Sequence, residues 1–109
     1  MAITFEPVSE EVLNETARLS ASLQVGDRYS FDPVITASCI PRPGTHLNGL
    51  PTLDFGSGVF IGMKEGRMIF EGHPKDAPEK TDDWKFWFVV VASPEGKSRF
   101  RHMSRIGTK

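Results

Sequence analysis

The segment from Trp84 to Ile106 decides the fold. It reads Trp-Lys-Phe-Trp-Phe-Val-Val-Val-Ala, then Ser-Pro-Glu-Gly-Lys, then Ser-Arg-Phe-Arg-His-Met-Ser-Arg-Ile. Its outer parts are rich in aromatic and β-branched residues, which favour strands, and its middle part has the residues of a turn. The segment therefore predicts a β-hairpin. It also holds the densest apolar run and the densest basic run of the chain. We therefore expect it to contribute both to the core and to a binding surface.

The two faces of this hairpin follow from alternation, because successive strand residues point to opposite sides of a sheet. If Ala92 lies opposite Ser98, one face forms the core and gathers Trp84, Phe86, Phe88, Val90, Phe100 and Ile106. The other face gathers Trp87, Val89, Val91, Arg99, Arg101, Met103 and Arg105. A register slip of one residue would exchange the two faces, so the pairing can be tested.

The bulk composition is that of a single soluble domain spanning residues 1–109, with 39% apolar and 25% charged residues. No apolar run approaches the roughly 20 residues of a membrane helix, and the N-terminus lacks the pattern of a signal peptide. Cys39 is the only cysteine, so an internal disulfide is excluded and a reducing compartment is favoured. We expect a cytoplasmic protein without membrane contact.

Charge is distributed unevenly along the chain. Residues 1–54 carry three basic and seven acidic side chains, whereas residues 55–109 carry ten basic and seven acidic ones. From Gly96 to Lys109 there are five basic residues and no acidic one. A negatively charged partner would be steered to this end. The alternative is that the two halves neutralise each other within the fold.

One helix is predicted near the N-terminus, from Glu10 to Gln24. Ser9 is a good N-cap, acidic residues follow in the first turn, and Gly26 is a plausible stop. Residues on one face recur at helical spacing: Val12, Thr16, Leu19 and Leu23. This stripe predicts packing against a sheet.

Further strands are predicted where strand-forming residues lie between turn residues: Ile3–Phe5, Arg28–Phe31, Val34–Ile40, Thr52–Gly62 and Arg67–Glu71. Pro33 interrupts the second and third of these. Gly56 and Gly58 indicate a bulge or sharp bend, and Glu65-Gly66 indicates a type I turn with a bulge. The charged linker from His73 to Asp83 is predicted to be solvated.

These elements predict an α+β fold. One N-terminal helix packs on a curved, mostly antiparallel sheet of five or six strands. The internal glycines leave a small open barrel as a close variant.

The candidate site with the most specific pattern is the row of Arg99, Arg101 and Arg105 beside Trp87 and Met103. An aromatic residue among arginines suits a protein interface, and also suits single-stranded nucleic acid bound by stacking and phosphate contacts. A third interpretation is an ordinary solvated face, with arginine stems covering neighbouring valines. A net charge of −1 argues against broad nucleic-acid affinity.

A second candidate is the loop from Pro41 to Pro51, because a long proline-rich loop on a rigid sheet is a frequent place for binding residues. Its contact residues would be Arg42, His46, Leu47 and Asn48. The alternative is a plain connector between two parts of the sheet.

Catalytic and metal-binding motifs are not found. Cys39 and the histidines at 46, 73 and 102 lack close ligand spacing, and the predicted hairpin puts His102 in the core. Gly56-Ser-Gly-Val is followed by a strand and lacks the lysine or helix of a phosphate loop. We expect no cofactor, no metal and binding rather than catalysis. An enzyme subunit whose site forms only at an interface is a further interpretation.

The expected function is therefore non-catalytic binding of another macromolecule, a protein in the first instance, in an adaptor, inhibitor or immunity-type role. The alternative is a nucleic-acid-binding module that uses the basic and aromatic sheet face. The sequence leaves the oligomeric state open.

Overall fold

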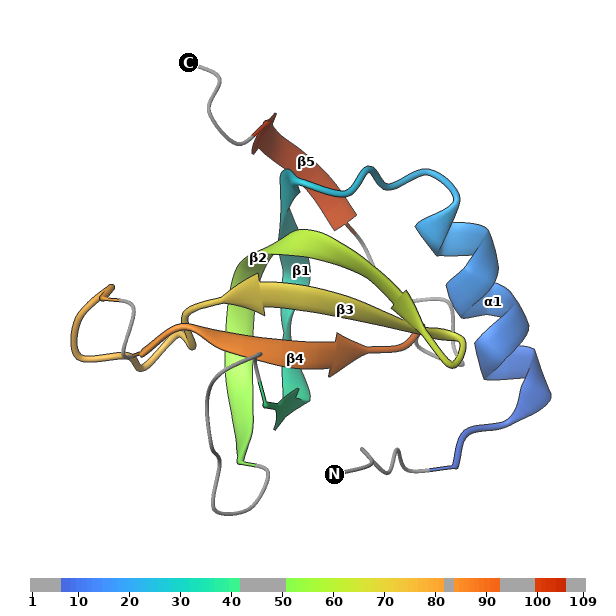
Figure 1. The fold of residues 1–109 in the computed structure, drawn as a ribbon, viewed down its shortest axis with the longest axis horizontal. Helices are drawn as coiled ribbons and strands as arrows, with labels where there is room; N and C mark the ends of the chain where they lie inside the picture. Colours follow the sequence, from blue (N-terminus) through green and yellow to red (C-terminus); the bar gives the residue numbers. More distant parts are fainter. Residues whose placement is uncertain (1–6, 42–50, 82–83, 93–99, 106–109) are drawn as a thin grey trace.

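The computed structural model describes residues 7–41, 51–81, 84–92 and 100–105, with side chains throughout except at 32–34 and 100–105. One helix packs against a five-stranded antiparallel sheet (Figure 1), so the predicted α+β class is confirmed. The elements are α1 Glu10–Ser20, β1 Asp27–Ile40, β2 Thr52–Lys64, β3 Arg67–Gly72, β4 Phe86–Val90 and β5 Phe100–Arg105. The strand predicted at Ile3–Phe5 lies outside the described residues.

The strand order is β2-β3-β4-β1-β5, and β1 also pairs with β2. The four strands β1 to β4 are thereby connected in a ring of hydrogen-bonded pairs, which gives the sheet its strong curvature (Figure 1). The 14 residues of β1 make this possible. The strand is long enough to pair with β2 from Arg28 to Ser38, with β5 from Asp27 to Phe31, and with β4 at Cys39 and Ile40. Among the described strands, β5 pairs with β1 and with no other.

The hairpin predicted from Trp84 to Ile106 is wrong in its pairing, although both of its strands exist. β4 pairs with β3 and with the end of β1, where Cys39 lies opposite Phe88. β5 pairs with the start of β1, from Asp27 to Phe31. The sequence pattern identified strands and faces, but alternation carries no information about which strand lies alongside.

The hairpin of β2 and β3 is confirmed, with a tighter turn than predicted. Lys64 pairs with Arg67, and the two residues between them have positive φ, 50° at Glu65 and 80° at Gly66. Positive φ at both central positions is the mark of a two-residue type I′ turn, whose twist matches that of the strands. The predicted type I turn with a bulge is therefore wrong.

Helix α1 begins as predicted, since the N–H of Val12 donates to the Ser9 hydroxyl at 3.2 Å. It ends at Ser20 rather than at Gln24. The hydroxyls of Ser20 and Ser22 donate to carbonyls of the last turn, a local alternative that competes with helix continuation. Within the described residues, no helix combines the length and apolar character needed to cross a bilayer.

The core is aromatic, and Phe88 lies at its centre. The Phe55 and Phe88 rings stack with centroids 3.8 Å apart, and both side chains are fully buried. Phe31 meets Phe70 and Phe88 edge-on, with centroid distances of 5.1 and 6.0 Å. Edge-on contacts such as those of Phe31 are an arrangement that ring quadrupoles favour.

The faces predicted for β4 are confirmed. Phe88, Val90 and Ala92 are buried, whereas Trp87 and Val89 on the opposite face are partly exposed. Alternation therefore located the buried face correctly even though the neighbouring strand was misassigned.

Trp84 departs from the predicted core face. Its side chain is 37% exposed, because the residue precedes β4 and lies at the end of the linker. Phe86 is partly buried and packs against the core. The side chain of Phe100 and all of Ile106 lie outside the described part of the chain.

β2 changes the face that it turns to the core. Phe55 is buried, but from there the buried positions are Gly58 and Phe60, and the register against β1 shifts between Phe55 and Ser57, where Gly56 and Gly58 predicted a bulge or sharp bend. A Cβ added at Gly58 would lie 2.9 Å from Cζ of Phe88. Glycine is thus required where the β2 backbone crosses the ring of Phe88.

β1 is one strand rather than two segments interrupted by Pro33. Its register against β2 shifts between Ser30, opposite Ser57, and Ile35, opposite Phe55. This irregularity accommodates a proline, which has no N–H to donate to a regular ladder.

Candidate binding surface

The outer face of β3 and β4 carries the only candidate site residue whose side chain the structure describes, Trp87. We call this region the Trp87 surface, and it consists of Ile40, Ile69, Glu71, Lys85, Trp87 and Val89. Across the strands, Trp87 lies opposite Glu71 on one side and Ile40 on the other, and Val89 lies opposite Ile69. Alternation along β4 puts Trp87 on the side away from Phe88 and the aromatic core.

The indole of Trp87 is held by a hydrogen bond. Its Nε1–H donates to Oε2 of Glu71 at 2.9 Å in a partly buried setting. A hydrogen bond to a carboxylate is stronger than one between neutral groups, and this one joins residues directly opposite each other. The ring is therefore fixed in one orientation on a rigid strand while part of it remains exposed.

The surroundings of Trp87 combine apolar and charged side chains. Ile40 and Ile69 are only 3% and 4% exposed and form an apolar base, while Val89 and Lys85 are partly exposed. Aromatic residues such as Trp87 are enriched at protein-interaction sites, whereas Lys and Glu are depleted there.

The predicted arginine row does not lie beside Trp87 in the sheet. Arg101 and Arg105 are in β5, opposite Ser30 and Asp27 at the start of β1, whereas Trp87 pairs at its end with Ile40. The proximity of Trp87 and Met103 that the hairpin predicted is therefore wrong, and Arg99 lies outside the described residues. A role of these residues in binding stays a prediction.

The regularity of the row is also affected by a register shift. Ser104 lies opposite Arg28 and His102 lies opposite Tyr29, so Met103 is an extra residue without a partner position on β1. Such a bulge changes the simple alternation on which the common side of Arg101 and Arg105 was based.

The second predicted site, with Arg42, His46, Leu47 and Asn48, lies outside the described residues. Its two ends are described, and the N–H of Cys39 donates to the carbonyl of Pro51 at 2.9 Å. The loop between β1 and β2 therefore leaves from and returns to one place on the sheet. Its role in binding remains untested.

No group of three potential metal ligands occurs among the described residues. Cys39 is fully buried, and burial raises the pKa of its thiol to about 11, so the thiol stays protonated at neutral pH. Nε2 of His73 is 2.9 Å from the carbonyl oxygen of Thr81. The side chain of His102 and all of His46 lie outside the described part, so the core position predicted for His102 is untested.

The linker from His73 is largely exposed, at Lys75, Asp76 and residues 78–81, as its charge predicted, but it also contacts the fold. Pro74 is buried, and the Lys80 ammonium donates to its carbonyl at 3.3 Å. The backbone N–H of Lys75 donates to the carbonyl of Asp54 at 2.7 Å. Because β3 and β4 are direct neighbours, this segment connects an adjacent pair of strands rather than two separate hairpins.

Sequence reasoning missed Glu71 as a site residue. Glu71 and Trp87 become neighbours only through the pairing of β3 with β4, and no spacing rule predicts that pairing across an irregular linker. The sequence signal was limited to a carboxylate at an outward position of one strand, Glu71, and an indole at an outward position of another, Trp87. This pattern is compatible with many strand pairings.

No family model matches the chain, and no curated protein or solved structure is similar enough to count as a match. Function therefore has to be argued from the chemistry of the residues themselves.

Proposed function

We propose that this protein is a non-catalytic binding protein whose partner is another protein, which it contacts through the Trp87 surface. The observation that carries the proposal is the indole of Trp87, partly exposed and held at 2.9 Å by Glu71. An adaptor, inhibitor or immunity-type role in the cytoplasm fits this reading, and a single cysteine suits a reducing compartment.

A positioned tryptophan is well suited to protein recognition. Tryptophan is enriched among the residues that dominate binding energy, because it buries a large area with few rotatable bonds. A side chain that is already held by Glu71 loses less conformational freedom on binding than a free one. Val89 is partly exposed and extends the apolar area around it, above the buried Ile40 and Ile69.

Nucleic acid is the less favoured partner for this surface. The carboxylate of Glu71 lies directly beside the indole and would repel phosphate groups. The arginines of β5, on which that alternative depends, are at the opposite end of β1. A base stacked on Trp87 would therefore lack cations from β5 for its backbone.

The test is affinity capture from a lysate of the source organism, with and without nuclease, using the full chain, Trp87→Ala and the matched control Trp84→Ala. Both substitutions remove one partly exposed indole, but Trp84 precedes β4. We expect a stoichiometric protein that is retained by the wild type and by Trp84→Ala, is lost with Trp87→Ala, and is insensitive to nuclease. Equal capture by all three chains would contradict the assignment of the surface.

The hydrogen bond itself can be tested once such a protein is identified. Glu71→Ala frees the indole, and we expect the dissociation constant to rise roughly 2- to 12-fold, the equivalent of ordering one side chain. Glu71→Gln keeps a carbonyl acceptor and should have a smaller effect. If Glu71→Ala binds more tightly than the wild type, the carboxylate is an obstacle rather than a support.

A further inference from the structure

β5 differs from every other described strand in having a single neighbour. β1, β2, β3 and β4 each have at least two strand partners, whereas β5 pairs with β1 only. Figure 1 shows β5 at the margin of the sheet. Among the strands that the structure describes, β5 is therefore the open edge.

An open edge presents backbone donors and acceptors in a fixed row. β5 has six residues, Phe100–Arg105, and apart from the bulge at Met103 about half of their N–H and C=O groups point away from β1. Extended peptides bind such edges by adding a strand, with backbone hydrogen bonds supplying affinity and neighbouring charges selecting the sequence.

The charged residues of β5 itself are all basic, although Arg105 lies opposite Asp27 of β1. β5 contains Arg101 and Arg105 and no acidic residue, and it lies in the stretch from Gly96 to Lys109, which has five basic residues and no acidic one. Opposite charges across paired strands stabilise the pair, and like charges destabilise it. An added strand that carries carboxylates is thus favoured.

The same charges disfavour a second copy of this chain. Antiparallel pairing of β5 with β5 about Met103 would set Arg101 of each copy opposite Arg105 of the other. Any other register of β5 against itself lacks a carboxylate to offset these cations. The edge is thereby protected from self-association while it stays open to an acidic strand.

We propose that the edge of β5 binds an extended acidic segment of another protein by strand addition. This inference does not depend on the Trp87 surface, because β5 and Trp87 pair with opposite ends of β1. A nucleic acid would share the attraction to arginine but would make no backbone ladder, and this difference is the basis of the test.

The probe is a fluorescein-labelled eight-residue peptide of alternating Glu and Val, titrated with the full-length protein at low salt and followed by anisotropy. An otherwise identical peptide with an N-methyl group on every residue keeps the charge but loses the donors for the ladder on both of its edges. We expect it to bind at least about ten-fold more weakly. A Lys-Val peptide should show no saturable binding. Equal binding of the methylated peptide, or tighter binding of an oligothymidylate of equal charge, would overturn the proposal.

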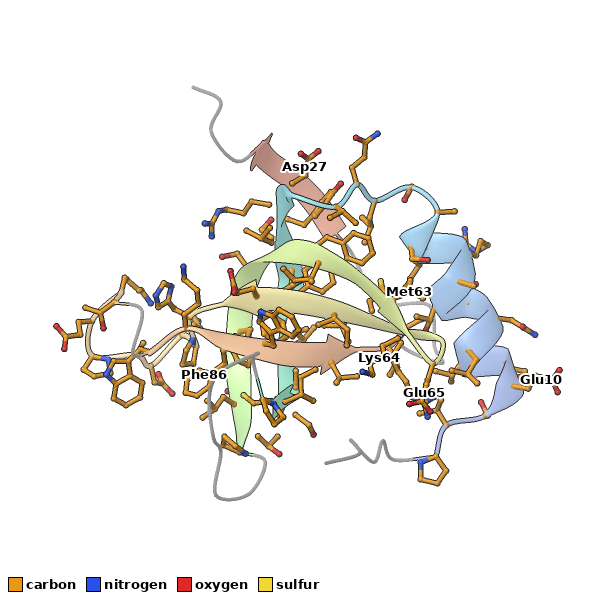
Figure 2. All side chains as sticks on the ribbon, in the orientation of Figure 1. Glu10, Asp27, Met63, Lys64, Glu65 and Phe86 are labelled. Carbon is orange, nitrogen blue, oxygen red and sulfur yellow. The ribbon has the colours of Figure 1, made fainter. Side chains whose placement is uncertain are left out.

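The protein side of the test uses two variants with the same charge change. Arg101→Glu places a carboxylate on β5, whereas Lys64→Glu does so at the β2–β3 turn, away from Asp27 and β5 in Figure 2. We expect Arg101→Glu to weaken the Glu-Val peptide at least about ten-fold and Lys64→Glu to leave it within about two-fold. Amide shifts on binding should map to Phe100–Arg105. Shifts centred on Trp87, or equal losses in the two variants, would contradict strand addition at β5.

Discussion

β4 and β5 are two strands that the sequence pattern joined in one hairpin and that the fold separates. β4 consists of aromatic and β-branched residues, has neighbours on both sides and buries Phe88 completely. β5 contains two arginines and a histidine and lies at the margin, with one neighbour among the described strands. The comparison teaches that composition reflects how central a strand is, and alternation reflects which face is buried. Neither identifies the adjacent strand.

The largest expected effect on stability is that of Phe88→Ala, which tests whether β4 is a central strand. Phe88 is fully buried and contacts rings from β1, β2 and β3, so its truncation should lower the free energy of unfolding by roughly 3–5 kcal/mol. Urea denaturation followed by circular dichroism measures this. Trp84→Ala is the control, and its effect should stay within about 0.5 kcal/mol. A loss below about 1 kcal/mol for Phe88→Ala would mean that β4 is not central.

The next test concerns the close approach of β2 to the same ring. Gly58→Ala brings a methyl group 2.9 Å from Cζ of Phe88 and 3.2 Å from the carbonyl oxygen of Glu71. We expect a loss of roughly 1–3 kcal/mol through overpacking, measured in the same denaturation experiment. Combining it with Phe88→Leu should recover part of this loss, because the smaller side chain leaves room. Additive losses in the double variant would show that Phe88 is not the obstacle.

A smaller effect is expected where the helix meets the end of β4. The Thr16 hydroxyl is fully buried, donates to the carbonyl of Val12 at 2.7 Å and accepts from the N–H of Ala92 at 2.8 Å. Thr16→Val keeps the shape but leaves that N–H without its acceptor, which should cost about 1–2 kcal/mol. Thr16→Ser keeps the hydroxyl and should be less destabilising than Thr16→Val in urea denaturation, and the reverse order would contradict the role of the hydroxyl.

The smallest effect is confined to alkaline pH and reports the contact of β4 with β1. Cys39 lies opposite Phe88, and burial raises the pKa of its thiol from 9.0 to about 11. Because the folded state favours the protonated thiol, the buried thiol contributes fully to the free energy of unfolding below pH 9. This contribution is lost as the pH rises towards 11. The difference in stability between wild type and Cys39→Ala should therefore shrink above pH 9. A difference that is independent of pH would place the thiol in water.

Local features of the fold were predictable because their causes are local. The cap at Ser9 depends on a hydroxyl three residues from the N–H it accepts from, and the β2–β3 hairpin depends on Glu65-Gly66 between two strands. The alternation of β4 depends on its own sequence. The continuity of β1 through Pro33 was missed, since the rule that proline interrupts a strand ignores bulges.

The candidate site was predictable only in part for the same reason. Trp87 follows from alternation along β4, and its outward position is confirmed. Glu71 and Ile40 come from β3 and β1, and their approach to Trp87 is fixed by tertiary pairing. Predicting them requires the strand order, and the order was lost with the misassigned hairpin.

The ring of strands described above has a consequence for the order of folding events. The β2–β3 hairpin joins neighbours in sequence, whereas the β4–β1 contact is limited to Cys39 with Phe88 and Ile40 with Trp87, across a long intervening chain. Contacts that close long loops form slowly, because chain entropy opposes them until most of the structure is in place. The ring should therefore close late, and Trp87, which lies at the closure, reaches its final environment only then. A change in the fluorescence of Trp87 should therefore report the rate of the last step of folding.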